Sequence, residues 1–214
     1  VTPFSKVING KAYPFPKYLI RTFKNDQGHS IKLGFISVCL PFNKSSYVVY
    51  TDPLSTAEML YHQIKDSCDA VVAITHQAME DDIELAKRLP ELALIMGGHE
   101  HDMRLQRVGK VWITKAHANS KSAFINRLRI VRKQTQTKEV EVTPELKYLD
   151  TSVVKHTSTQ EVVQKWSAKA AKNFASLGFD AQRVILEKGE ELEGRESYVR
   201  STTTNLTKLV IRSM

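Results

Sequence analysis

The sequence predicts an α/β fold, with a largely parallel sheet between layers of helices. Apolar runs at residues 70–74 and 92–96 have the length and composition of strands that are buried on both faces. A β-rich run at 31–38 precedes them, and segments with helical spacing separate the three runs. Strands and helices that alternate in this way are typical of a parallel sheet covered by helices.

The upstream elements follow from local signals. Residues 1–30 are expected to be irregular or extended, because prolines interrupt any helix there. Asp52 and Pro53 suit the N-cap and the first position of a helix, and apolar residues at helical spacing extend this helix over 53–66. A second helix is expected over 81–89, where a proline follows it.

Downstream of these elements the pattern changes to short strands. Residues 111–114, 123–132 and 140–149 are each rich in β-branched or apolar residues, with a glycine turn before the first. They predict a second, mostly antiparallel sheet that closes the same domain.

The remaining chain is predicted to be mostly helical. Ser158 and Glu161 have the spacing of a capping box, and a long helix with one buried face is expected to follow and to end at Gly178. Its apolar stripe consists of Val162, Trp166, Ala170, Phe174 and Leu177. A short strand is expected at 184–186, and a last helix from about Thr203.

The composition is that of an ordinary globular protein with a basic surplus. The chain has 214 residues and a formal net charge of +8, but it contains no run of five basic residues and no zinc-finger signature. We interpret the surplus as a solvated surface, so a nucleic-acid partner is not expected. No apolar run approaches the roughly 20 residues that cross a bilayer.

Histidines stand at the carboxyl ends of two predicted strands. His76 ends one strand, and His99 and His101 follow the next. The carboxyl edge of an open α/β sheet is where ligands bind, because the loops that leave it converge. A His-x-His pair lets one imidazole serve each of two neighbouring metal ions. A lone histidine here is more often a satisfied polar residue, but the whole combination favours metal ligation.

The neighbours of these histidines have their own expected roles. Gly97 and Gly98 let the backbone turn sharply before the ligands, which places Gly98 at the edge of the site. Glu100 is interpreted as a spacer that faces away. Asp102 is a candidate hydrogen-bond acceptor that orients the metal-binding imidazole of His101 or the adjacent loop. His117 lies after a strand and could reach the edge of the site, although a surface or structural role is favoured.

These motifs resemble those of the calcineurin-like metallophosphoesterases. The similarity is greatest to their 5'-nucleotidase branch, which includes the bacterial UDP-sugar hydrolases. The motifs that carry it are residues 71–76, Asp82 with Leu85 and Ala86, and residues 94–102. Farther downstream, residues 192–200 and 204–206 resemble the opening of that branch's C-terminal substrate-binding domain.

The resemblance implies an incomplete metallophosphoesterase β-sandwich flanked by helices (α/β/β/α-type). A linker helix and the start of a second α/β domain would follow. The implied limits are 1–149 for the C-terminal part of the metallophosphoesterase domain, 150–178 for the linker helix and 179–214 for the beginning of the 5'-nucleotidase C-terminal domain. By analogy with the family, a periplasmic, secreted or cell-surface location is expected.

The resemblance also implies two divalent metal ions. His76 and His99 match the ligands of one ion, and His101 matches a ligand of the other. Zinc or manganese is expected because imidazole suits transition metals, with cobalt, calcium or magnesium as alternatives. In the family arrangement, a metal-activated hydroxide cleaves the phosphate of a nucleotide or sugar nucleotide, a reaction of nucleotide catabolism.

The family's upstream motifs are not found in this sequence. They are an Asp-x-His pair, a metal-bridging Asp, and an Asn-His-Asp segment that holds the catalytic histidine. We therefore expect no catalytic residue in this chain, and the chain alone is expected to be inactive. It is either a fragment of a longer gene product, the interpretation we favour, or a degenerate relative. The alternative function is that of a pseudoenzyme that binds nucleotides or metal.

Overall fold

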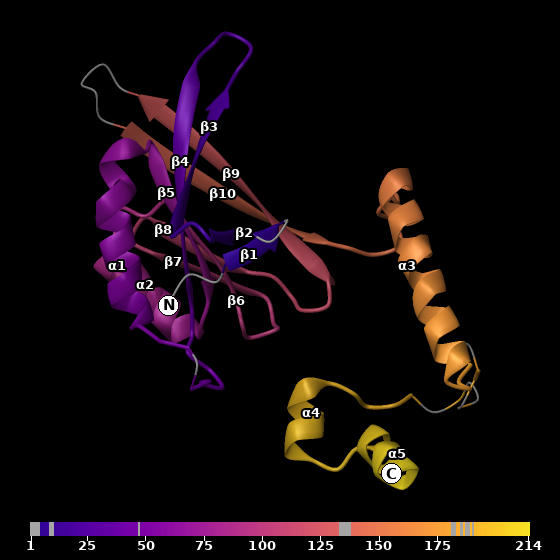
Figure 1. Ribbon diagram of the computed structural model, residues 1–214. Helices are drawn as coiled ribbons and strands as arrows, with labels where there is room; N and C mark the ends of the chain where they lie inside the picture. Colours follow the sequence, from indigo (N-terminus) through magenta and orange to yellow (C-terminus); the bar gives the residue numbers. More distant parts are fainter. Residues whose placement is uncertain are drawn as a thin grey trace. The chain divides into compact units, whose positions relative to one another are not determined.

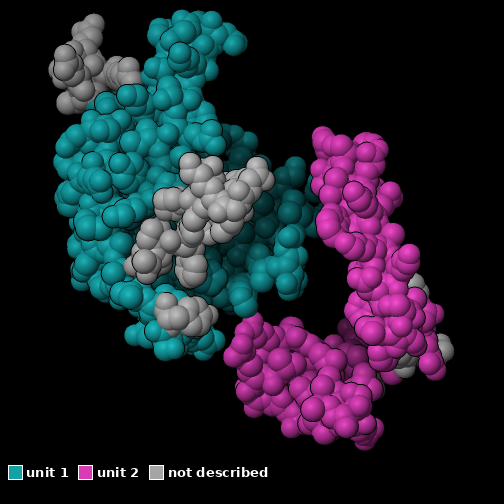
Figure 2. Space-filling view, viewed as in Figure 1, with its two compact units in different colours: residues 1–153 teal, residues 154–214 magenta. Residues whose placement is uncertain are grey.

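The computed structural model describes the residues 5–8, 11–46, 48–132, 138–180, 183, 184, 186, 189 and 191–214. The chain divides into two compact units, residues 1–153 and 154–214 (Figure 2). The predicted domain limits at residues 149 and 178 stay predictions. Nowhere in the described residues does a helix combine the length and the apolar content that a membrane crossing requires.

Most helices and strands expected from the sequence are present, with shifts at their ends. The strands are β1 (Ser5–Ile8), β2 (Lys11–Pro14), β3 (Tyr18–Lys24), β4 (Ser30–Cys39), β5 (Ala70–His76), β6 (Leu94–Gly98), β7 (Arg104–Val108), β8 (Val111–Lys115), β9 (Ser122–Arg132) and β10 (Lys138–Tyr148). The helices are α1 (Pro53–Ile64), the short 3-10 helix η1 (Lys65–Ser67), α2 (Met79–Arg88), α3 (Thr157–Ser176), α4 (Glu196–Ser201) and α5 (Asn205–Ser213).

Within the described residues, six strands form one mixed sheet in the order β3-β4-β5-β6-β8-β7. β4, β5, β6 and β8 run parallel, and β3 and β7 pair antiparallel at the two edges. The prediction that residues 111–114 belong to a second, antiparallel sheet is therefore wrong. β7 and β8 form a hairpin that inserts β8 next to β6, where it occupies the backbone groups that β6 would otherwise expose.

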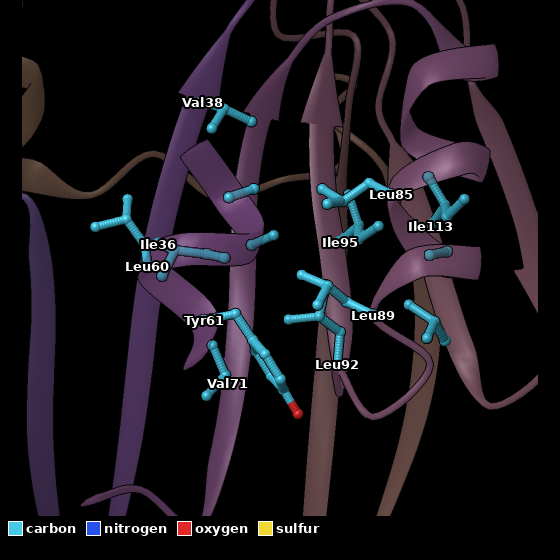
Figure 3. Packing of buried hydrophobic residues seen from close by; sticks show 14 of the residues in the cluster. Ile36, Val38, Leu60, Tyr61, Val71, Leu85, Leu89, Leu92, Ile95 and Ile113 are labelled. Atoms are coloured by element: carbon cyan, nitrogen blue, oxygen red, sulfur yellow. The ribbon is translucent and has the colours of Figure 1, made fainter. Parts of the chain in front are cut away.

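The sheet separates two apolar cores. α1 and α2 cover one face, and the antiparallel hairpin of β9 and β10 packs on the other (Figure 1). Side chains alternate along β5, so that Val71 and Ala73 join the core beneath the helices, while Ala70 and Val72 join the core beneath the hairpin. Figure 3 shows the first core, where side chains of the helices meet those of the strands. The predicted α/β class is confirmed.

The start of α1 follows from its first residues. The carboxylate of Asp52 accepts a hydrogen bond from the backbone N–H of Ser55 at 2.8 Å, and Pro53 occupies the first helical position. Hydrogen bonding by Ser55 also lowers the pKa of the Asp52 carboxyl. The predicted N-cap is confirmed.

Residues 1–30 contain more strand than the sequence predicts. β1 pairs with β2, and β3 pairs with β4, both in antiparallel register. The prolines exclude a helix but not a strand: Pro14 ends β2 and Pro16 follows it, positions where proline is tolerated. Pro3 lies outside the described residues.

The turn between β7 and β8 depends on a glycine. Gly109 has a φ of 58°, and an added Cβ would meet no described atom within 4 Å. The substitution Gly109→Ala is therefore expected to lower the free energy of unfolding by about 1 kcal/mol through backbone strain alone. Gly109→Asn should lower it less, because asparagine tolerates this conformation. Urea unfolding of the two variants tests this, and equal losses would contradict it.

In the second unit, the prediction for α3 is partly wrong. None of the described residues of α3 is buried, and Trp166 in its apolar stripe is 59% exposed. Amphipathic spacing identifies an apolar face but not a partner, and the described residues of this unit do not bury it. The capping box is also wrong, because His156 is the N-cap and Ser158 lies inside the first turn, with its Oγ 3.1 Å from His156 Nδ1.

The helix ends of the second unit agree better with the sequence. Gly178 has a φ of 82° and its N–H donates to the carbonyl of Ala175 at 3.0 Å, which confirms it as the cap of α3. The helix expected from about Thr203 is confirmed as α5, with Thr204 as its N-cap. The strand expected at 184–186 lies partly outside the described residues.

Candidate metal centre

The carboxyl ends of β4, β5, β6 and β8 meet at one edge of the sheet because these strands are parallel. The register pairs His76, the last residue of β5, with Gly98, the last residue of β6. It also pairs Gly97 with Lys115 at the end of β8. The loop that begins at His99 therefore starts next to His76.

His76 and His99 form a side-by-side imidazole pair. Their ring centroids are 5.5 Å apart and their planes meet at 77°. Both residues are exposed at the sheet edge. An added Cβ on Gly98 would lie 3.2 Å from Nδ1 of His76, so the missing side chain leaves room for the His76 ring.

His101 does not join this pair in a larger group. Within the described part of the chain, no three or more His, Cys, Asp or Glu side chains gather closely enough to hold a metal ion. The carbonyl of His101 accepts a hydrogen bond from the N–H of Ala118 at 2.8 Å, which ties the loop to the segment after β8. The structure thus brings together two of the three predicted ligands.

The strained backbone conformations of this segment occur at His99 and His101 and not at the two glycines before them. His99 has a φ of 99° and His101 a φ of 65°, in the region that favours glycine. Such conformations typically cost about 1–3 kcal/mol each and persist where the surrounding structure enforces them. The prediction that Gly97 and Gly98 make the sharp turn is wrong, because neither has a positive φ and both belong to β6.

A largely buried group of charged and polar side chains adjoins this loop. We call it the Lys115 cluster, and it consists of Lys115, Asp82, Glu100 and Gln77. Lys115 Nζ lies 2.9 Å from Asp82 Oδ2 and 2.8 Å from Glu100 Oε2. It also donates to the carbonyl of Gln77 at 2.7 Å. The Gln77 amide in turn donates to Asp82 Oδ1 at 3.0 Å. One ammonium group therefore links the end of β5, α2 and the loop after β6.

Burial sets the electrostatics of this cluster. The side chains of Lys115 and Asp82 are 1% and 0% exposed, and that of Glu100 is 16% exposed. Burial raises the pKa of the Asp82 carboxyl, and the neighbouring Lys115 ammonium group and Gln77 amide act in the opposite direction. Charges this deep are tolerated because they are paired, so Lys115 is the cation on which both carboxylates depend.

Glu100 does more than separate the two histidines. Both of its carboxylate oxygens accept hydrogen bonds from Lys115 Nζ, at 3.0 and 2.8 Å. Lys115 itself was not among the residues singled out from the sequence. A signal existed, because a lysine directly after the apolar run 111–114 lies at the same sheet edge as His76, and a buried lysine needs a partner.

Asp102 and His117 lie near the loop with contacts of their own. Asp102 is exposed and its carboxylate lies 3.5 Å from the guanidinium of Arg104. His117 is half-buried, and its Nδ1 lies 2.8 Å from Ser122 Oγ. Its ring also stands 5.7 Å from that of Tyr148. These contacts suit structural roles, and their predicted places at the edge of the site stay predictions.

Gly97 is needed for the Lys115 cluster. An added Cβ would lie 2.7 Å from Lys115 Cε and 2.8 Å from Asp82 Oδ2, and neither buried group has room to move. We expect Gly97→Ala to lower the free energy of unfolding by about 1–3 kcal/mol. The matched control is Gly189→Ala, where the added Cβ meets no described atom within 4 Å. Urea unfolding compares them, and an effect of Gly97→Ala no larger than the control's would disprove the close contact.

The chemistry of the imidazole pair fits a divalent transition metal. Two imidazoles that bind one tetrahedral ion at about 2.0–2.1 Å have ring centres roughly 5 Å apart. The 5.5 Å separation of His76 and His99 is close to this value. These two residues therefore fit as two ligands of a single ion.

Comparison with known proteins identifies the fold. No protein-family model matches the chain. Over 104 residues the chain is 27% identical to the uncharacterized metallophosphoesterase YunD of Bacillus subtilis. This match covers 47% of the chain and 21% of YunD. The structure of the calcineurin-like phosphoesterase YfkN from Bacillus subtilis superposes with a TM-score of 0.56 at 15% identity, covering 73% of this chain and 59% of that one.

A further similarity is weaker. The sulfate thiohydrolase SoxB of Thermus thermophilus has a TM-score of 0.47 at 24% identity, covering 67% of this chain and 27% of that one. Because this TM-score is below 0.5, the assignment rests on the two Bacillus subtilis proteins. The chain spans about a fifth of the length of YunD, 21%. Its mixed sheet, flanking helices and second sheet are those of the calcineurin-like metallophosphoesterase fold.

Proposed function

We propose that this chain belongs to a phosphoester hydrolase that acts on nucleotides with the help of two divalent metal ions. The observation that carries the proposal is the His76–His99 pair, with ring centroids 5.5 Å apart at the carboxyl edge of a metallophosphoesterase fold. The similarity to a protein named as a metallophosphoesterase supports the same class of reaction.

The residues of this chain would divide the work as follows. His76 and His99 would hold one ion, and His101, two residues farther along the loop, would bind the other. When bound, the ions supply an activated water and neutralise charge on the phosphoryl group. Zinc or manganese suits the imidazole donors best. The catalytic histidine of the family has no counterpart in this chain.

The nucleotide is the finer part of the proposal. It is supported by residues 192–200, which resemble the opening of the 5'-nucleotidase branch's C-terminal substrate-binding domain. Asn205 at the start of α5 contacts the beginning of this segment. The side chain of Asn205 accepts a hydrogen bond from the N–H of Glu193 at 2.8 Å and donates to the carbonyl of Glu191 at 2.9 Å. A periplasmic, secreted or surface location stays a prediction.

The test is hydrolysis of AMP by the complete gene product in the presence of Mn²⁺. We expect phosphate release that a chelator abolishes and that His99→Ala lowers by about 100-fold or more. Losing a direct ligand should cost more than losing a residue that only orients a ligand, which weakens metal binding about 10–100-fold. The control is His62→Ala, on the exposed side of α1, which should leave the rate unchanged. Unchanged turnover in His99→Ala would refute the assignment.

A second candidate is a pseudoenzyme that binds nucleotide or metal without turnover. It is favoured by the described residues, which offer no group of three or more potential ligands. The gene sequence upstream of Val1 separates the two candidates. Asp-x-His and Asn-His-Asp motifs there would support the enzyme, and their absence would support the binding module.

A further inference from the structure

We propose that Lys115 is a positioning residue of this metal centre. It would act through Glu100, whose carboxylate it binds, and would set the backbone on both sides of Glu100 so that His99 faces His76. This inference rests on the proposed function for its purpose, but its structural content concerns the histidine pair alone.

The ammonium group of Lys115 fixes the carboxylate of Glu100. Lys115 Nζ binds both oxygens of Glu100, at 2.8 and 3.0 Å, and is itself held by Asp82 Oδ2 at 2.9 Å and by the carbonyl of Gln77 at 2.7 Å. With the Lys115 side chain 1% exposed, water has little access to compete for these contacts. Glu100 is therefore anchored at a fixed point of the sheet edge.

The backbone is strained on both sides of Glu100. Glu100 lies between His99, with a φ of 99°, and His101, with a φ of 65°. L-residues adopt such conformations when other contacts compensate for the strain. The ion pair of Glu100 with Lys115 can supply this compensation, because it fixes the residue between the two strained ones.

Lys115 contacts the residue that follows each of the two candidate ligands. Gln77, whose carbonyl binds Lys115, directly follows His76, and Glu100 directly follows His99. The same ammonium group thus holds the neighbours of both imidazoles in register. A lysine that served stability alone would not need to contact the residue after each of the two candidate ligands.

The experiment compares Glu100→Ala and Glu100→Gln in the metal-free chain by NMR. The readout is the nuclear Overhauser effect between the ring protons of His76 and His99, whose centroids are 5.5 Å apart. We expect the signal to disappear in Glu100→Ala and to remain in part in Glu100→Gln, whose amide oxygen can still accept from Lys115. Methyl signals of Ile95 and Ile113, both buried, report that the core is intact.

The second arm titrates the same proteins with Co²⁺. We expect the affinity of Glu100→Ala to fall by about 10-fold or more, as is usual when a residue that orients a ligand is lost. The matched control is Glu141→Ala, which removes an exposed carboxylate that is paired with Arg129 on the β9–β10 hairpin. If Glu100→Ala does not fold, Glu100→Asp replaces it in both measurements. Aspartate keeps the charge but shortens the side chain, so we expect this variant also to lose the His76–His99 nuclear Overhauser effect.

The outcomes separate the two proposals. An unchanged His76–His99 signal in the folded Glu100→Ala or Glu100→Asp protein would overturn the positioning role, whatever the metal affinity. Loss of that signal in a chain whose wild type does not bind Co²⁺ would support the positioning role and count against the proposed function.

Discussion

Replacing Lys115 by methionine is expected to lower the free energy of unfolding by about 3–5 kcal/mol at pH 7, because the change leaves the buried carboxylate of Asp82 and the partly buried one of Glu100 without their cation. Asp82 and Glu100 have side chains that are 0% and 16% exposed, so water cannot replace the ammonium group. Urea unfolding followed by the fluorescence of Trp112 measures the loss, in a Trp166→Phe background that removes the other tryptophan.

The pH dependence of this loss has a definite sign. Lys115 acts to lower the pKa of Asp82, which burial raises. Without Lys115 the pKa of the buried carboxyl rises further, so the penalty is fully present above that pKa and disappears as the carboxyl becomes protonated. The difference between variant and wild type should therefore shrink as the pH is lowered from 7. Lys147→Met, on the exposed side of β10, is the control. A loss that is independent of pH would contradict the buried-charge explanation.

The second large effect is expected at the imidazole pair. His76→Ala and His99→Ala should each weaken Zn²⁺ binding by this chain by about 100-fold or more. A lost ligand has a larger effect than the roughly 10-fold to 100-fold loss caused by removing a residue that only orients a ligand. Isothermal titration measures the affinities at a pH where imidazole is neutral.

His101→Ala supplies the internal comparison. His101 does not gather with the other two histidines within the described residues, so its loss should leave the first ion's affinity nearly unchanged. An equal effect of all three substitutions would show that the three histidines share one ion, and would contradict the division between two ions.

Much of the fold could be predicted because its signals are local. The cap at Asp52, the helical spacing after it and the apolar run of β5 each depend on neighbouring residues, and the structure contains the elements they predict. The place of β8 could not be predicted. Residues 111–114 look the same whether they pair with β6 or with a separate sheet, and the pairing is decided by tertiary contacts.

One part of the candidate site could be predicted from the sequence and another part could not. The proximity of His76 and His99 follows from strand order, because the carboxyl ends of parallel strands share an edge. The Lys115 cluster assembles Asp82 from α2, Glu100 from a loop and Lys115 from β8. No sequence spacing connects these residues, so a lysine at a strand end resembles an ordinary surface cation until the structure shows that it is buried.

Crystals of this chain soaked with zinc would test the central claim most directly. We expect an anomalous difference peak between the rings of His76 and His99, at about 2.0–2.1 Å from one nitrogen of each. Zinc bound at other sites in well-ordered crystals, with no peak between these two rings, would contradict the assignment of the pair as metal ligands.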